Sequence, residues 1–319
     1  PPAPRKSGEM SGERVLVTGA SGFVGRHLLR ELSAAGYKVR AAVRRPGPEI
    51  AGVEQVVIGD LSGVVHWGAA LAGVRHVVHG AGLAHADSEL PEEAYRRVNT
   101  DATLALADAA RAAGVARFVF LSSIRAQSGP ASDRPLSEGD APAPTDAYGR
   151  SKLAAEQGLA ERDLDWVALR PVLVYGPGVK ANMAGLVRLA RLPFPLPLGG
   201  LKAPRSLLAV ENLCDTVIFA LGEACPARRS YIVSDPGALG VADMLAAMRA
   251  GLGRRPGLIA VPPALLGVAA RLLGRPGVYE RLTGGLVAPP YALLSAGWQP
   301  RLATKAALAR LAESPAGEV

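Results

Sequence analysis

The sequence predicts an α/β protein with a doubly wound parallel sheet, helices on both faces, and a smaller mixed α/β C-terminal region. Three observations support this prediction. Short apolar, β-rich segments alternate with amphipathic helical segments from residue 13 onward, which is typical of βαβ units. A glycine-rich turn separates the first strand from the first helix. After Tyr175, Pro and Gly become frequent and break the alternation.

The alternation defines the expected elements. The strands are RVLVTG, KVRAAV, EQVVIGD, HVVHGA, RFVFLSS and WVALRPVLVYG, and helices are expected over RHLLRELSAAG, from about Pro91 to Ala113 and over 144–160. We divide the chain into a tail over 1–12 that we expect to be disordered, a first domain over 13–175, and a region over 176–319. Some segments of this last region are expected to return to the first domain.

Composition narrows the function classes. The chain has 319 residues, of which 49% are hydrophobic, and Cys214 and Cys225 form no CxxC pair, so we expect neither a metal site nor a disulfide. The N-terminus resembles no signal peptide and no apolar run spans a bilayer, so we expect a cytoplasmic protein without a transmembrane segment.

The net charge of +8 favours anionic partners. Aromatic residues are only 5% and do not interleave with the basic ones, so we do not expect nucleic acid. Phosphate on a small molecule explains the charge, and a peripheral contact with an anionic membrane is left open. The amphipathic stretch at 261–274 is interpreted as a packed helix, with membrane contact as the alternative.

The glycine loop predicts a dinucleotide site. In RVLVTGASGFVGRHLL, Gly19 permits the tight turn, Gly22 lets the backbone approach a pyrophosphate at the helix N-terminus, and Gly25 allows close helix–strand packing. Ser21, Phe23 and Val24 belong to the same loop. We therefore interpret 13–175 as a Rossmann domain that binds NAD or NADP(H).

The end of the second strand bears on the choice of cofactor. An acidic residue there would bond the ribose 2′-hydroxyl of NAD, but this chain has Arg44 and Arg45, which suit a 2′-phosphate. The alternative is that one arginine stacks on the adenine or faces solvent. Asp60, followed by Leu61 after the third strand, is placed to reach the adenine amino group, unless it is a plain turn residue.

Tyr148 and Lys152 in AYGRSK are four residues apart and share one face of the predicted helix. A phenol is a poor base at neutral pH, but a nearby ammonium favours its ionised form. Ser122 and Ser123 stand at the end of a predicted strand, where a hydroxyl would complete the site by bonding a substrate oxygen.

The chain resembles the extended short-chain dehydrogenase/reductase family. The resemblance is carried by six segments in this order: TGASGFVG, GDL, VN, LSS, YGRSK and LRPVLVYGPG. The resemblance covers nearly the whole chain from residue 13 and is greatest to bacterial nucleotide-sugar 4-epimerases and 4-keto reductases. It implies that Tyr148 is the acid/base, that Lys152 holds the nicotinamide ribose and lowers the tyrosine pKa, and that Ser123 rather than Ser122 bonds the reacting oxygen. It also implies cofactor contacts at Ala81, Gly82, Asn99, Pro171 and Val174. His79 and His85 are interpreted as structural.

The chain departs from the family pattern at positions that affect the substrate. Ile124 and Arg125 replace the Asp and Glu of sugar dehydratases, which makes dehydration an unfavoured activity, and Val172 replaces a polar residue common in epimerases. By resemblance, Arg205 and Asn182 contact the nucleotide diphosphate, with Arg281 as a second phosphate contact.

The sequence thus predicts an enzyme. We expect a UDP-hexose or UDP-N-acetylhexosamine 4-epimerase, with an NADPH-dependent 4-keto nucleotide-sugar reductase as the alternative. A related possibility is a lipid-linked diphosphosugar as substrate. A non-catalytic cofactor-binding subunit is the third hypothesis, and a homodimer through the helix of Tyr148 is expected from the resemblance.

Overall fold

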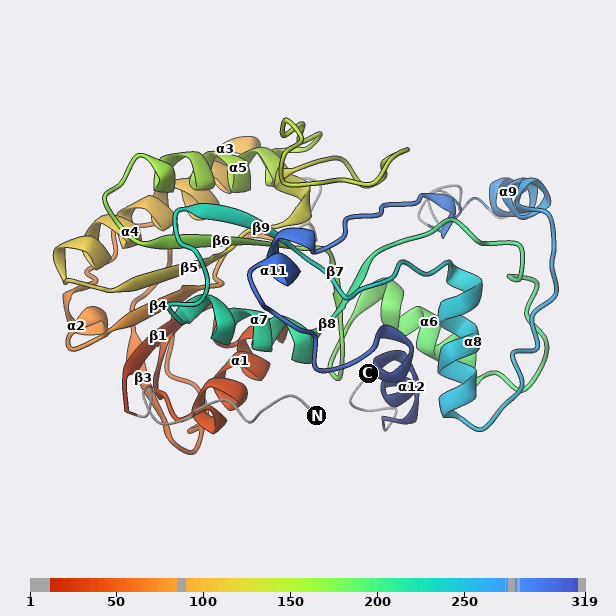
Figure 1. The fold of residues 1–319 in the computed structure, drawn as a ribbon, viewed down its shortest axis with the longest axis horizontal. Helices are drawn as coiled ribbons and strands as arrows, with labels where there is room; N and C mark the ends of the chain where they lie inside the picture. Colours follow the sequence, from red (N-terminus) through yellow and green to blue (C-terminus); the bar gives the residue numbers. More distant parts are fainter. Residues whose placement is uncertain (1–11, 85–89, 273, 275–278, 280–281, 315–319) are drawn as a thin grey trace.

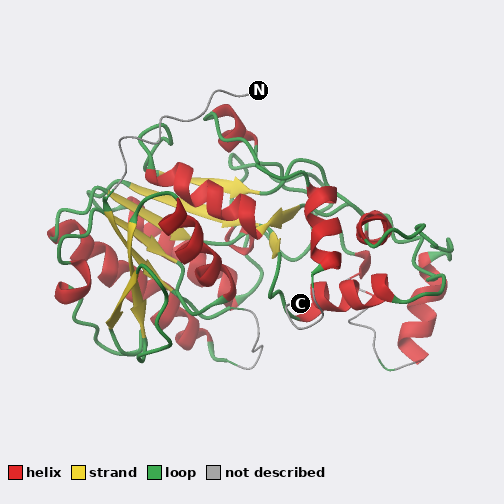
Figure 2. Ribbon diagram, turned by 90° about the horizontal axis from the view of Figure 1, so that it is seen from below, coloured by secondary structure: helices red, strands yellow, loops and turns green. Residues whose placement is uncertain are grey.

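The structure is a computed structural model that describes residues 12–84, 90–272, 274, 279 and 282–314. Its centre is a seven-stranded, fully parallel sheet in the order β3-β2-β1-β4-β5-β6-β9 (Figures 1 and 2). The strands are β1 (Arg14–Thr18), β2 (Lys38–Val43), β3 (Val53–Val57), β4 (His76–His79), β5 (Arg117–Leu121), β6 (Trp166–Pro171) and β9 (Arg229–Val233). This arrangement confirms the predicted doubly wound α/β fold. The predicted disordered tail and His85 lie outside the described residues.

Helices cover both faces of this sheet because the strand side chains alternate between two apolar cores. Val15 and Val17 point into a core shared with α1 (Phe23–Ala34) and α7 (Val210–Leu221), whereas Leu16 points into the opposite core. The opposite core is covered by α2 (Gly68–Leu71), α4 (Ala102–Ala112) and α5 (Ala147–Ala160). The sequence alternation therefore reflects a sheet buried on both sides.

The helix expected from about Pro91 to Ala113 is present, but it is not uniform. It consists of α3 (Glu92–Tyr95), a six-residue π-helical segment η1 (Arg96–Asp101) and α4. π-Helical turns inside helices occur frequently at functional sites, because they re-aim side chains.

The segment WVALRPVLVYG is also divided. β6 ends at Pro171, and β7 (Leu173–Tyr175) pairs instead with β8 (Leu207–Ala209) in a separate two-stranded parallel sheet. Val172, which is buried, lies at the break, and its amide donates to Val233 of β9. The chain thus passes from the large sheet to the C-terminal region at this point.

The C-terminal region surrounds a third apolar core. The elements packed there include α6 (Ala181–Arg191), α8 (Val241–Gly251) and α12 (Thr304–Glu313), while α9 (Pro263–Leu272) lies further out (Figure 1). α11 (Tyr291–Ser295) and β9 return to the large sheet, and a short turn η2 (Ile124–Ala126) follows β5. Cys214 and Cys225 are buried and free.

Candidate active site and cofactor cavity

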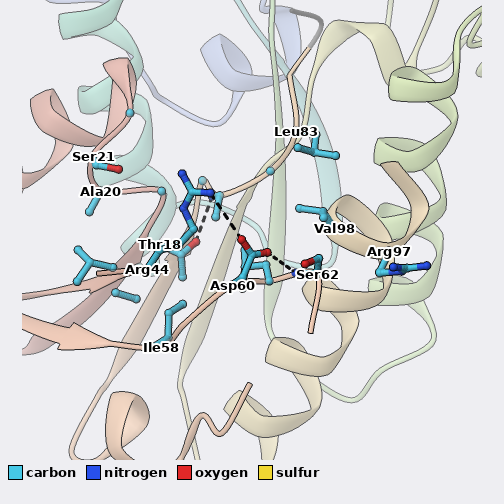
Figure 3. Close-up of a pocket in the computed structure, with 18 of the residues that line it drawn as sticks. Thr18, Ala20, Ser21, Arg44, Ile58, Asp60, Ser62, Leu83, Arg97 and Val98 are labelled. Atoms are coloured by element: carbon cyan, nitrogen blue, oxygen red, sulfur yellow. Dashed lines mark hydrogen bonds and ion pairs between the residues drawn. The ribbon is translucent and has the colours of Figure 1, made fainter. Parts of the chain in front are cut away.

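A cavity of about 530 Å³ lies at the carboxyl ends of β1, β2 and β4, where parallel sheets bind ligands (Figure 3). Eight of the predicted cofactor residues line it: Gly19, Ser21, Gly22, Arg44, Asp60, Leu61, Ala81 and Gly82. Others do not line this cavity, namely Phe23, Val24, Gly25, Arg45, Asn99, Lys152, Pro171 and Val174. The structure therefore gathers half of the predicted set in one place.

The glycine loop is shaped by close backbone contacts. Gly19 has a φ of 71°, and a Cβ there would lie 2.6 Å from the carbonyl carbon of Gly80. A Cβ on Gly25 would lie 2.1 Å from the carbonyl oxygen of Gly19, which agrees with the predicted close packing of helix and loop. Side chains at these positions would collide with the backbone of the loop and of Gly80. The glycines therefore permit a tight loop at the N-terminus of α1, which begins at Phe23 and whose backbone amides suit an anionic group.

Arg44 and Asp60 mark the other end of the cavity (Figure 3). The Arg44 guanidinium lies 3.6 Å from the Asp60 carboxylate, and its side chain is 76% exposed. The backbone amide of Ser62 donates to Asp60 at 2.8 Å and is the main reason that the pKa of Asp60 is lowered. Asp60 is therefore an ionised acceptor. Arg45 is exposed and lies outside the cavity lining.

Arg97 also lines this cavity, although the sequence analysis did not identify it. It lies in the π-helical segment, two residues before Asn99. A basic residue close to the predicted Asn99 was the only sequence signal for Arg97. The direction of the Arg97 side chain depends on the π-helical turn, which the sequence pattern does not show.

Asn99 connects three parts of the site. Its amide group donates to the Leu83 carbonyl at 3.1 Å and to Ser151 on α5 at 3.0 Å, and its oxygen accepts from the Leu83 amide at 2.7 Å. A Cβ on Gly82 would lie 2.8 Å from the Asn99 oxygen and 3.4 Å from the Lys152 Nζ. Gly82 thus lies between the cavity and the α5 residues, and only a glycine fits there.

Tyr148 and Ser123 are brought together by α5 and the turn after β5. The Ser123 hydroxyl is hydrogen-bonded to the phenol of Tyr148. Asp146 caps α5 by accepting from the Gly149 amide at 2.7 Å. A Cβ on Gly149 would lie 2.3 Å from the Arg125 carbonyl oxygen, so this glycine lets α5 approach the turn that carries Ser123. Gly149 was not among the site residues predicted from the sequence.

The residues that replace the dehydratase acid/base pair have structural partners. Ile124 is buried in the core, and the Arg125 guanidinium pairs with Asp146 at 2.5 Å. Neither side chain is a carboxylate, which agrees with the expectation that dehydration is unfavoured.

Ser122 points elsewhere. Its hydroxyl donates to the buried carboxylate of Glu156, which also accepts from Arg170 and from Ser230. The structure therefore places Ser123, and not Ser122, beside Tyr148.

Lys152 is buried below the site. Its ammonium donates to the Leu121 carbonyl at 2.9 Å and lies 4.6 Å from the centre of the Phe120 ring. Burial lowers its pKa to about 8, while Glu156 acts in the opposite direction. Burial also raises the pKa of Tyr148, which the bond to Ser123 partly offsets, so the phenol is protonated at neutral pH.

His79 is buried between two threonines. Its Nδ1 lies 2.7 Å from the Thr18 hydroxyl and its Nε2 lies 2.9 Å from the Thr103 hydroxyl. Burial, together with the charge of Lys152, lowers the pKa of His79 to about 3. A neutral, fully bonded imidazole fits the structural interpretation.

A second cavity of about 390 Å³ lies in the C-terminal region and is lined by Asn182 and Arg205 among apolar side chains from α6 and α8. Arg205 donates to the Gly284 carbonyl at 2.5 Å, and burial lowers its pKa. The predicted phosphate contact Arg281 lies outside the described residues. Among the described residues, no group of three His, Cys, Asp or Glu side chains is placed to hold a metal ion.

Residues 15–233 match the sequence model of the NAD dependent epimerase/dehydratase family. The chain belongs to this family. The membership confirms the resemblance seen in the sequence, the prediction of a short-chain dehydrogenase/reductase type enzyme, and a nicotinamide dinucleotide as the family cofactor. Among the helices that the structure describes, none is long and apolar enough to cross a bilayer.

The relatives include an epimerase and a reductase. The chain is 34% identical to the UDP-glucose 4-epimerase of Vibrio cholerae over 297 residues, which covers 90% of each chain. It is also 34% identical to the ceramide reductase of Caulobacter vibrioides over 225 residues, or 67% of this chain and 65% of the relative.

A solved structure is similar over almost the whole chain. MoeE5 in complex with UDP-glucose and NAD superposes with a TM-score of 0.71 at 29% identity, covering 94% of this chain and 97% of that one. The likeness therefore extends through the C-terminal region that holds the second cavity.

Proposed function

We propose that this chain is a nicotinamide-dependent 4-epimerase of UDP-sugars, either a UDP-hexose or a UDP-N-acetylhexosamine. The observation that carries the proposal is the hydrogen bond between Ser123 and Tyr148 on the helix that also carries Lys152. The similarity to a UDP-glucose 4-epimerase over 90% of the chain supports the same reaction.

The residues around the first cavity fit a dinucleotide. The glycine loop and the start of α1 would hold the pyrophosphate, Asp60 would accept from the adenine amino group, and Gly82 leaves room for the nicotinamide half. The chemistry that a bound nicotinamide supplies is acceptance of the sugar C4 hydride and its return. Asn99 supports this end by fixing Leu83 and Ser151.

Tyr148 would move the proton of the sugar C4 oxygen. A protonated phenol donates to a ketone oxygen, and the reverse transfer needs a lower pKa, which the ammonium of Lys152 favours. The Ser123 hydroxyl would bond the same oxygen and fix its position. Arg205 and Asn182, which line the second cavity, would hold the diphosphate, since a guanidinium fork suits phosphate oxygens.

The first experiment is to denature the purified protein and identify any released dinucleotide by mass. Purified protein is then incubated with UDP-glucose or UDP-N-acetylglucosamine, and the C4 epimers are separated by chromatography. We expect retained NAD and interconversion of one epimer pair without net consumption of cofactor. Failure to interconvert either pair, in protein shown to hold NAD, would contradict the proposal.

A second candidate, an NADPH-dependent 4-keto nucleotide-sugar reductase, is favoured by one observation. The end of β2 carries Arg44 on the cavity wall and no acidic residue for a ribose 2′-hydroxyl. If Arg44 binds a 2′-phosphate, Arg44→Gln lowers the preference for NADPH over NADH by about tenfold, because a charge-assisted hydrogen bond is lost. The exposed Arg45→Gln is the matched control. An unchanged preference in Arg44→Gln would leave the epimerase as the better assignment.

A further inference from the structure

The charged residues of this chain are unevenly distributed. The net charge of +8 results from 36 Lys and Arg and 28 Asp and Glu. The segments 176–210 and 244–279 contain ten of the basic residues and none of the acidic ones. The excess of positive charge therefore belongs to these two segments, because the rest of the chain has 26 basic and 28 acidic residues.

Much of this basic charge faces solvent. Six of the side chains are exposed: Lys180, Arg188, Lys202, Arg254, Arg255 and Arg271. None of the six takes part in the ion pairs formed between described residues. Their charge is thus available to an external anionic surface.

An apolar stripe lies on α9, which also carries Arg271, one of these cations. Leu265, Val268 and Leu272 of α9 are 60%, 53% and 83% exposed, and their spacing places them on one face of the helix. The opposite side of α9 is packed, because Gly267 lies against the ring of Tyr279. Figure 1 shows α9 at the end of the molecule furthest from the seven-stranded sheet.

We propose that the exposed face of α9, with this stripe and Arg271, docks onto an anionic lipid bilayer, and that the other exposed cations of the C-terminal region add a longer-range attraction. A helix with one apolar face and neighbouring cations lies in the headgroup layer, where the apolar side chains leave water and the cations meet lipid phosphates. α9 has ten residues and is therefore about 15 Å long, which suits a helix that lies in the interface.

Two other occupants fit the same face less well. A second copy of the chain would bring two regions of the same positive charge together, and like charges repel. A nucleic acid would meet the cations, but α9 contains no aromatic side chain on which a base could stack. A lipid surface uses both the charge and the stripe. Docking concerns where the protein works, so it stands independently of the proposed reaction.

Flotation of the full chain with vesicles tests the proposal. With phosphatidylcholine and phosphatidylglycerol vesicles at about 3:1, we expect the protein to float in about 0.05 M salt and to be released in about 0.5 M salt. The variant Leu265→Ser/Val268→Ser/Leu272→Ser should lower the partition coefficient at least about tenfold, and Arg271→Gln should lower it about fivefold.

The matched control removes exposed apolar side chains elsewhere. Val57 and Val64 are 54% and 89% exposed in the first domain, and Val57→Ser/Val64→Ser should float like the wild type. Melting temperatures show that each variant is folded. The proposal is overturned if the wild type does not float at low salt, or if the α9 variant floats equally well. It is likewise overturned if the α9 variant loses only self-association in light scattering, or if the wild type binds RNA but not vesicles.

Discussion

Two polar clusters share helix α5 and differ in how their charges are paired. Around Glu156, the carboxylate accepts from Arg170 at 2.5 Å and from Ser230 at 2.7 Å, and it also accepts from Ser122. One turn earlier, Lys152 is equally buried, but within the described chain it forms no ion pair and donates to the Leu121 carbonyl.

The difference indicates two roles for buried charges, one structural and one functional. A buried charge whose hydrogen-bonding capacity is filled by fixed partners ties elements together, and here the Glu156 cluster links β5, α5, β6 and β9. A buried charge without an ion partner has its pKa shifted toward the working range, which is typical of functional groups. The pKa of Lys152, lowered to about 8 by burial, is of this second kind.

Replacing Tyr148 by Phe is expected to have the largest effect on activity. The variant loses the phenol that we propose moves the proton, so turnover should fall by about 10³-fold or more. Its free energy of unfolding should change by no more than about 1.5 kcal/mol, because one hydrogen bond to Ser123 is lost. Epimer interconversion and urea unfolding measure the two quantities. Tyr291→Phe, at a 66% exposed position, is the control, and comparable activity in the two variants would contradict the assignment.

Replacing Glu156 by Gln should instead act mainly on stability. Arg170 would be left buried without its counter-charge, which costs about 3–5 kcal/mol of unfolding free energy. The double variant Glu156→Leu/Arg170→Leu should recover a large part of that loss, since apolar replacement of a buried pair is often neutral. Urea unfolding of the single and double variants gives the coupling energy. A double variant that is less stable than the single one would show that the remaining partners, and not the pair, dominate.

The cluster around Lys152 could be predicted from the sequence, whereas the cluster around Glu156 could not. Tyr148 and Lys152 are four residues apart on one helix, so local geometry alone places them on one face. Glu156 and Arg170 belong to different elements, and only the register of β6 beside β5 and β9 brings them together. The choice of Ser123 over Ser122 came instead from the family resemblance of the segment that follows these serines.

The fold was predicted from the alternation of apolar strands and helices, but two local features were not. The break at Val172 and the π-helical turn over Arg96–Asp101 both depend on tertiary pairing, with Val233 in one case and with Leu83 and Ser151 in the other. Periodicity in the sequence does not show such pairing. For the same reason Arg97 was missed as a cavity residue.

The pH dependence of the stability of Lys152→Met tests the same difference between the two clusters. We expect this replacement to have the smallest effect on stability. A lysine whose folded-state pKa is lowered binds fewer protons when folded, so wild-type stability rises as pH rises from about 8 to about 10.5. Below pH 8, the buried charge of Lys152 destabilises the wild type by about 3 kcal/mol. The variant avoids this cost, but it also loses the hydrogen bond to the Leu121 carbonyl, which offsets part of the gain. At pH 7.5 Lys152→Met should therefore be at least as stable as the wild type.

Between about pH 7.5 and pH 10, the stability of Lys152→Met relative to the wild type should fall, because only the wild type regains the penalty. Urea unfolding across this range measures the difference, and groups that titrate alike in both proteins cancel. Lys38→Met, at an exposed position of β2, is the matched control. If the unfolding free energy of Lys152→Met relative to the wild type does not change over this pH range, burial does not penalise the Lys152 ammonium. The Lys152 and Glu156 clusters would then not differ in the way their contacts indicate.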